Sequence, residues 1–105
     1  MVKITIIILT KNAGKSFRSL LERIHSQSFE DFEVLIIDSS STDSTLKIAE
    51  EYKTRIYTIK PTEFHHSKTR NLGASLAKGE ILVYITQDAL PLNNSWLKNL
   101  ISPLE

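Results

Sequence analysis

The sequence predicts an α/β fold in which helices cover both faces of a parallel β-sheet. Two observations lead to this prediction: apolar, strand-like runs alternate with stretches of helical periodicity, and the connections between them are short. Such an alternation is typical of parallel strands joined by right-handed crossovers. A length of 105 residues suits one compact domain, so we expect a single domain over residues 1–105.

The first strand is predicted over residues 3–9, where β-branched residues form an almost unbroken run. Continuous runs of this kind are typical of parallel strands that are buried on both faces. A helix follows, because apolar residues then recur with spacings of three and four, as expected for one buried stripe. That stripe consists of Phe17, Leu20, Leu21 and Ile24.

A second buried strand is predicted over residues 32–37, and residues 41–43 offer N-cap candidates for the next helix. The apolar face of that helix is expected to consist of Leu46, Ala49 and Tyr52. Residues 55–59 alternate between polar and apolar, which predicts a third strand at an edge of the sheet.

The third helix is predicted to begin near Ser67 and to end at Gly79, since a glycine commonly follows a helix. Gly73, within that helix, would allow a close approach between helix and sheet. Residues 81–85 form a fourth apolar run and are predicted as a buried strand. The last helix would consist of a cap at Asn93 or Asn94 and the apolar residues Trp96, Leu97, Leu100 and Ile101.

A Rossmann-like arrangement of these elements has three layers and the strand order 3-2-1-4, so that the first and fourth strands are neighbours. The winding of the sheet reverses between those two strands, and ligands of such folds bind at the carboxyl ends of the strands there. Polar clusters follow the first, second and fourth strands, at residues 10–12, 38–43 and 86–89. The sequence therefore predicts a binding site at this edge of the sheet.

The composition excludes several classes of function. The 13 basic and 12 acidic residues give a net charge of +1, which is no basic footprint for nucleic acid. The chain has no cysteine, which excludes disulfides, thiolate catalysis and cysteine-based zinc sites and fits a reducing compartment. No apolar run approaches the ~20 residues of a membrane span. We expect a cytoplasmic location, in solution or at the inner face of the membrane.

The polar clusters each admit two interpretations. Asp38 could accept hydrogen bonds from a base or ribose, or it could cap the serine-rich loop that follows it. Residues 39–42 lead into a helix N-terminus, where backbone N–H groups favour an anion, although plain capping is equally consistent. Asp88 could hold Mg²⁺ or Mn²⁺ together with substrate phosphates, or it could be a turn residue ahead of Pro91.

The start of the third helix carries further candidates. Arg70 stands in the first turn, against the dipole preference for acids, so a phosphate or carboxylate partner is one interpretation and a surface salt bridge the other. Asn71 could pin a loop or a ligand hydroxyl. Adjacent side chains diverge, so His65 and His66 are not expected to share a metal. Because a glycine-rich phosphate loop is missing, phosphates would be bound by side chains and metal.

Several motifs occur in order along the chain, at residues 4–12, 27–34, 38–43, 69–74, 77–80 and 87–89. Together they resemble the N-terminal part of family-2 glycosyltransferases, which have the GT-A fold, and the likeness extends over essentially the whole chain. Residues 64–71 and the Thr-Gln-Asp-Ala segment at 86–89 look most like the rhamnosyltransferase-like branch of that family, which points to polysaccharide biosynthesis.

The resemblance implies a role for each polar cluster in nucleotide-sugar binding. By this likeness, Thr10 and Asn12 would line the nucleotide pocket, and Asp38 would contact the base. Ser39 and Ser40 would lie beside that carboxylate.

The remaining implied roles concern the diphosphate and the sugar. Arg70 would approach the diphosphate or sugar, with Asn71 beside it. Asp88 would be the surviving acid of the Asp-x-Asp metal motif, holding Mg²⁺ or Mn²⁺, because Thr86 occupies the position of the first Asp. A second departure is Lys11, which replaces a common Tyr.

The implied reaction is transfer of a sugar from a UDP- or dTDP-sugar to an acceptor hydroxyl, on a glycan or a lipid-linked sugar that the residues do not specify. The general base is expected beyond Glu105, so this chain would be a truncated donor-binding part with little or no turnover. A non-catalytic nucleotide-binding or partner module is the alternative. A flavodoxin-like phosphoacceptor domain is disfavoured, because residues 10–12 provide no acidic pair after the first strand.

Overall fold

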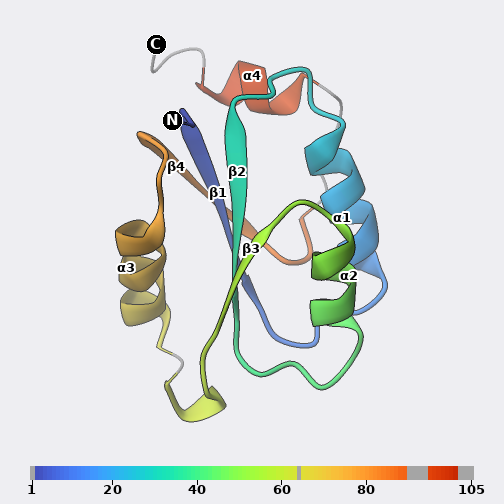
Figure 1. Cartoon of the computed structure of the whole chain (residues 1–105), viewed down its shortest axis with the longest axis vertical. Coiled ribbons are helices and arrows are strands. Elements are labelled where there is room, and N and C mark those ends of the chain that lie inside the picture. Colours follow the sequence, from blue (N-terminus) through green and yellow to red (C-terminus); the bar gives the residue numbers. More distant parts are fainter. Residues whose placement is uncertain (1, 64, 90–94, 102–105) are drawn as a thin grey trace.

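A computed structural model describes residues 2–63, 65–89 and 95–101 of the chain. Its four strands form one sheet in the order β3-β2-β1-β4, with every neighbouring pair parallel (Figure 1). The predicted α/β class and the strand order 3-2-1-4 are confirmed. The elements are β1 (Ile4–Thr10), α1 (Ser16–His25), β2 (Phe32–Asp38), α2 (Thr45–Glu51), β3 (Arg55–Thr58), the short 3₁₀ helix η1 (Pro61–Glu63), α3 (His66–Leu76), β4 (Ile81–Thr86) and α4 (Trp96–Ile101).

The helices form layers on both sides of the sheet. Helices α1 and α2 lie on one face, whereas α3 lies on the other (Figure 1). Side chains of a strand alternate between its two faces, so the continuous apolar run of β1 supplies both layers. Ile4, Ile6 and Ile8 belong to the core beneath α1 and α2, and Ile7 belongs to the core beneath α3.

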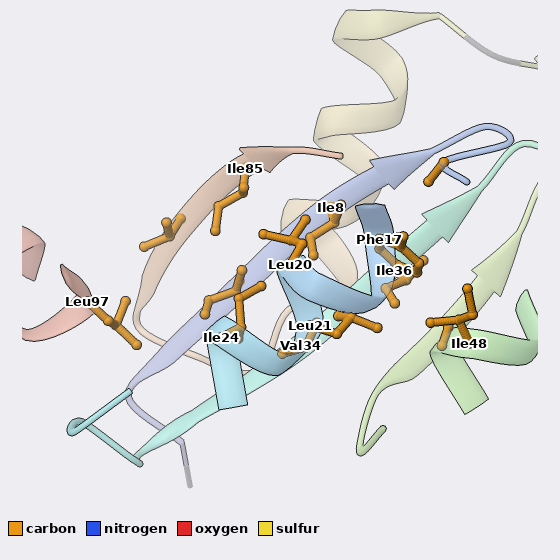
Figure 2. Close-up of a cluster of buried hydrophobic side chains, with 14 of the residues drawn as sticks. Ile8, Phe17, Leu20, Leu21, Ile24, Val34, Ile36, Ile48, Ile85 and Leu97 are labelled. Carbon is orange, nitrogen blue, oxygen red and sulfur yellow. The ribbon is translucent and has the colours of Figure 1, made fainter. Parts of the chain in front are cut away.

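The larger core lies between the sheet and the apolar stripe of α1, as Figure 2 shows. All four residues of the predicted stripe are buried, and Ile48 of α2 and Leu97 of α4 join the same cluster. The fully buried residues of the stripe are Phe17, Leu20, Leu21 and Ile24. The helical spacing of the sequence thus positions α1 correctly.

The smaller core lies beneath α3, where Leu72 and Leu76 pack against Ile7, Leu35 and Ile37 of β1 and β2. At Gly73 an added Cβ would lie 3.0 Å from Ile7 Cγ2 and 3.2 Å from a methyl group of Ile37. The predicted close approach of this helix to the sheet is therefore confirmed.

The prediction of a buried fourth strand is wrong for one face of β4. Leu82 and Tyr84 are each 36% exposed, and Thr86 on the same face is exposed as well. The reason is the position of α3, which packs on β1 and β2. The apolar run predicts the strand, but it does not reveal whether a helix covers both faces of that strand.

Two predicted helix ends also differ from the structure. Helix α3 ends at Leu76, three residues before Gly79, and α2 ends at Glu51, so that Tyr52 follows it in an extended conformation. Gly79 instead lies against the backbone of β1. Asn93 and Asn94, the predicted caps of the last helix, lie outside the described residues. Within the described parts of the chain, no helix is long and apolar enough to cross a membrane.

Candidate functional site

The carboxyl ends of β1, β2 and β4 meet at one edge of the sheet. In the strand register Thr10 of β1 stands opposite Asp38 of β2, and Leu9 stands opposite Thr86 of β4. The polar segments that follow these strands are therefore neighbours in space.

Asp38 is the centre of the contact between the first two of these segments. Its side chain is fully buried, and one carboxylate oxygen accepts hydrogen bonds from the hydroxyls of Thr10 and Ser41, each at 2.6 Å. The other oxygen accepts the backbone N–H of Ser41 at 2.7 Å. These hydrogen bonds support the interpretation that Asp38 caps the serine-rich loop. The contact with a base remains a prediction, and these hydrogen bonds would have to rearrange to permit it.

Asn12 ties the loop after β1 to the loop after β2. Its backbone N–H donates to the hydroxyl of Ser41, and its side-chain oxygen accepts the backbone N–H groups of Thr42 and Asp43. Asn12 (φ 46°) and Ser40 (φ 56°) both adopt the left-handed conformation, which is uncommon for residues other than glycine. The two loops thus hold each other in a conformation that neither segment favours alone.

Asp43 fixes the start of α2 from outside the helix. Its carboxylate accepts hydrogen bonds from the hydroxyl and the backbone N–H of Thr45, and these hold the pKa of Asp43 below its ordinary value. The residue at the cap position is Ser44, whose side chain makes no capping hydrogen bond. Of the three predicted cap candidates, Asp43 therefore caps the helix, although it lies one residue before the N-cap position.

Lys11 and Gln87 connect all three segments, although neither was predicted to have a binding role. The backbone N–H of Lys11 donates to the side-chain oxygen of Gln87 (2.8 Å), and the Gln87 amide donates to the backbone oxygen of Lys11 (3.2 Å). The Lys11 ammonium donates to the backbone oxygens of Ser39 (2.9 Å) and Ser40 (3.0 Å). Two features of the sequence could have indicated these roles. Gln87 belongs to the polar cluster after the fourth strand, and Lys11 replaces a tyrosine that is common in the resembled family.

A cavity of about 510 Å³ opens at this edge, on the side of the sheet that carries α3. Tyr84 and Thr86, from the exposed face of β4, form part of its wall. Its cationic residues are Lys11 and Arg70, and none of the described residues that line it is acidic. The lining consists of Ile7, Leu9, Thr10, Lys11, Ser39, Pro61, Arg70, Tyr84, Ile85, Thr86 and Gln87.

Tyr84 of β4 holds Arg70 of α3 at the cavity wall. The guanidinium carbon of Arg70 lies 5.0 Å from the centre of the Tyr84 ring, within the range of a cation–π interaction. The Tyr84 hydroxyl donates to the backbone oxygen of Arg70 at 2.9 Å. Tyr84 was not predicted as a site residue, because its position in an apolar run indicated burial only.

The structure does not place every predicted residue in the cavity wall. Thr10, Ser39 and Arg70 line it. The predicted site residues that do not line it are Asn12, Asp38, Ser40, Asn71 and Asp88. Asp88 lies within a turn in which the backbone N–H of Ala89 donates to the backbone oxygen of Thr86, as the alternative interpretation of Asp88 as a turn residue expects.

The family of the chain follows from comparison with known proteins. A parallel α/β sheet with a polar crevice at its switch point defines the broad class of doubly wound α/β domains, which bind their ligands at that point. The chain belongs to glycosyltransferase family 2, because the model of "Glycosyl transferase family 2" matches residues 5–105. The predicted resemblance is confirmed, and the fold is the N-terminal part of a GT-A fold.

Relatives and solved structures agree with this assignment. The chain is 38% identical over 104 residues to the O-antigen chain rhamnosyltransferase WbaN of Salmonella anatum, covering 97% of this chain and 33% of the relative. TarS of S. aureus in complex with UDP-GlcNAc matches with a TM-score of 0.81 and 28% identity, over 96% of this chain and 30% of that one. The mannosyltransferase PcManGT of Pyrobaculum calidifontis, in complex with GDP-Man and Mn²⁺, matches with a TM-score of 0.74 and 26% identity, over 88% and 29%. The chain thus spans about a third of the length of the curated relatives it matches.

Proposed function

We propose that this chain binds the nucleoside diphosphate of a nucleotide sugar, and that the protein transfers the sugar to an acceptor hydroxyl. The donor is a UDP- or dTDP-sugar, and the chain is its donor-binding part. The observation that carries the proposal is the cavity at the carboxyl edge of the sheet, with two cations and no described acid in its lining. A cytoplasmic location remains part of the proposal.

The preorganised loops support this proposal. Hydrogen bonds join the ends of β1 and β2 and the loops that follow these strands. The predicted residues in this region are Thr10, Asn12, Asp38, Ser39 and Ser40. A site whose conformation is fixed before the ligand arrives loses less conformational entropy on binding. The proposal assigns the diphosphate to the cationic part of the cavity, near Arg70.

A divalent cation fits this edge only as a partner of the diphosphate. The described residues contain no group of three or more His, Cys, Asp or Glu side chains that could hold a metal by themselves. Asp88 is an exposed carboxylate beside the crevice, and Mg²⁺ is often held by one or two carboxylates together with substrate phosphates. Bound there, the ion would neutralise charge on the leaving diphosphate.

The residues of this chain bind and orient the donor in this proposal, and they do not activate the acceptor. Arg70 would stabilise the negative charge that develops on the diphosphate as the bond to the sugar breaks. Deprotonation of the acceptor hydroxyl requires a general base within hydrogen-bond reach, and the described lining of the cavity offers no carboxylate for that step. We therefore expect the chain alone to bind donor without appreciable transfer.

Calorimetric titration of UDP and dTDP, with and without Mn²⁺, tests this proposal. We expect one of the two nucleotides to bind, and Mn²⁺ to increase its affinity, because the ion would link the diphosphate to the Asp88 carboxylate. In Asp88→Ala the increase should disappear, while the affinity without metal should stay that of the wild type. Asp31→Ala, an exposed aspartate on the loop before β2, is the matched control.

Two results would contradict the proposal in different ways. If the wild-type chain binds neither nucleotide, the donor-binding role is wrong, and a non-catalytic partner module becomes the better account. If Mn²⁺ increases the affinity of Asp88→Ala as much as that of the wild type, the donor site survives but the metal does not use Asp88.

A further inference from the structure

We propose that Lys11 binds the diphosphate of the nucleotide alongside Arg70 and sets the preference of the site for a diphosphate over a monophosphate. This inference rests on the proposed donor-binding function and adds a residue to it. It starts from the cavity, whose cationic lining residues are Lys11 and Arg70.

Hydrogen bonds fix both the backbone and the side-chain ammonium of Lys11. Its backbone is held by the amide of Gln87, in both hydrogen-bonding directions, at the end of β4. Its ammonium is held by the backbone oxygens of Ser39 and Ser40 at the end of β2. A lysine that is already ordered loses little further side-chain entropy when a ligand binds to it.

The anchored ammonium retains the capacity to bind a phosphate oxygen. A lysine ammonium has three N–H donors, and the two carbonyl contacts take two of them. Carbonyl groups stabilise the charge without neutralising it, so the positive charge of Lys11 stays at the cavity.

The local charge also favours a multiply charged anion. The whole chain has a net charge of only +1, so the cationic lining does not simply reflect a basic protein. The other polar groups of the lining, on Thr10, Ser39, Thr86 and Gln87, are neutral. A ligand with more negative charge near Lys11 and Arg70 should therefore bind more tightly than the same ligand with less.

Calorimetric titrations of UDP, UMP and uridine at a fixed Mn²⁺ concentration test this inference, with dTDP, dTMP and thymidine if that base is the one bound. In Lys11→Met we expect the affinity for the diphosphate to fall about tenfold, as for loss of one hydrogen bond to a charged group. The affinity for the nucleoside should stay within about twofold of the wild type, because binding of the base does not use the charge. Lys15→Met, the same change at an exposed lysine outside the cavity, should leave both affinities unchanged.

A second variant separates the charge of Lys11 from its anchoring contacts. Gln at position 11 can still donate to a backbone oxygen but carries no charge, so Lys11→Gln should lose the diphosphate preference as Lys11→Met does. Thermal unfolding of each variant establishes that the compared chains are folded.

Two outcomes would overturn the inference. One is a Lys11→Met variant that prefers the diphosphate over the monophosphate as strongly as the control variant Lys15→Met does. The other is an equal loss of affinity for diphosphate and nucleoside, which would make Lys11 a positioning residue of the loop only. Either result leaves the proposed function intact, whereas wild-type chain that binds no nucleotide defeats both.

Discussion

Asp38→Ala is expected to lower the free energy of unfolding by about 3 kcal/mol or more, because it leaves three hydrogen-bond donors without their acceptor. The fully buried carboxylate accepts hydrogen bonds from Thr10 and Ser41, and its removal leaves those donors without their acceptor. Each buried donor left unsatisfied costs about 1–3 kcal/mol. Because small domains are stable by only about 5–15 kcal/mol, this loss is a large fraction of the total stability.

Equilibrium unfolding in urea measures this loss, with Asp31→Ala as the control. Asp31 is an exposed aspartate one residue before β2, and its replacement should change the stability by less than about 0.5 kcal/mol. If Asp38→Ala were no less stable than Asp31→Ala, the loops would not depend on the buried carboxylate. A ligand-binding role would then be the better explanation for an aspartate at this position.

Gly79→Ala is expected to cost about 3 kcal/mol or more, at the upper end of the range for overpacking. A Cβ at this position would lie 2.5 Å from both the carbonyl carbon of Ile4 and the backbone nitrogen of Thr5. The clash is with backbone in the central strand, which cannot rotate away as a side chain can. The backbone N–H of Gly79 also donates to the hydroxyl of Thr5, so a shift of the turn would break that contact (2.9 Å).

Gly14→Ala separates this steric effect from the ordinary effect of replacing a glycine. Gly14 has a φ of 76° but no heavy atom within 4 Å of an added Cβ, so only conformational strain opposes the change. We expect a loss of about 1–2 kcal/mol in its melting or urea transition, the cost of a left-handed conformation. A Gly79→Ala variant as stable as Gly14→Ala would show that the turn before β4 can move away from β1.

The sequence predicts the framework of this fold because the strands and α1 carry strong local patterns. The β-branched run of β1 and the stripe of α1 leave little choice of structure or of buried face. The close approach at Gly73 was predicted from the presence of a glycine within the third helix. The end of α3 was misplaced because Gly79 has a tertiary role, the contact with β1, that looks like a helix stop in the sequence.

The candidate site was predicted less completely than the fold, for a physical reason. That polar segments meet at one edge follows from strand order alone. Which side chains face the cavity and which serve the loops depends on hydrogen bonds between residues far apart in the chain, as between Lys11 and Gln87. Tyr84 was missed because a strand pattern does not reveal that a tyrosine packs against Arg70.

The central claim is that a nucleoside diphosphate binds at the carboxyl edge of β1, β2 and β4, and backbone amide NMR of the labelled chain tests it most directly. On addition of UDP or dTDP, we predict that the largest shift changes fall on the amides of Lys11, Ser39 and Arg70 and their neighbours. A second hollow, between α1 and α2, also carries cations and is the natural competitor for an anion. Its charged lining residues are Lys15, Lys47 and the ion pair of Arg18 with Glu51. Shift changes centred on that hollow, with none at the carboxyl edge, would contradict the account.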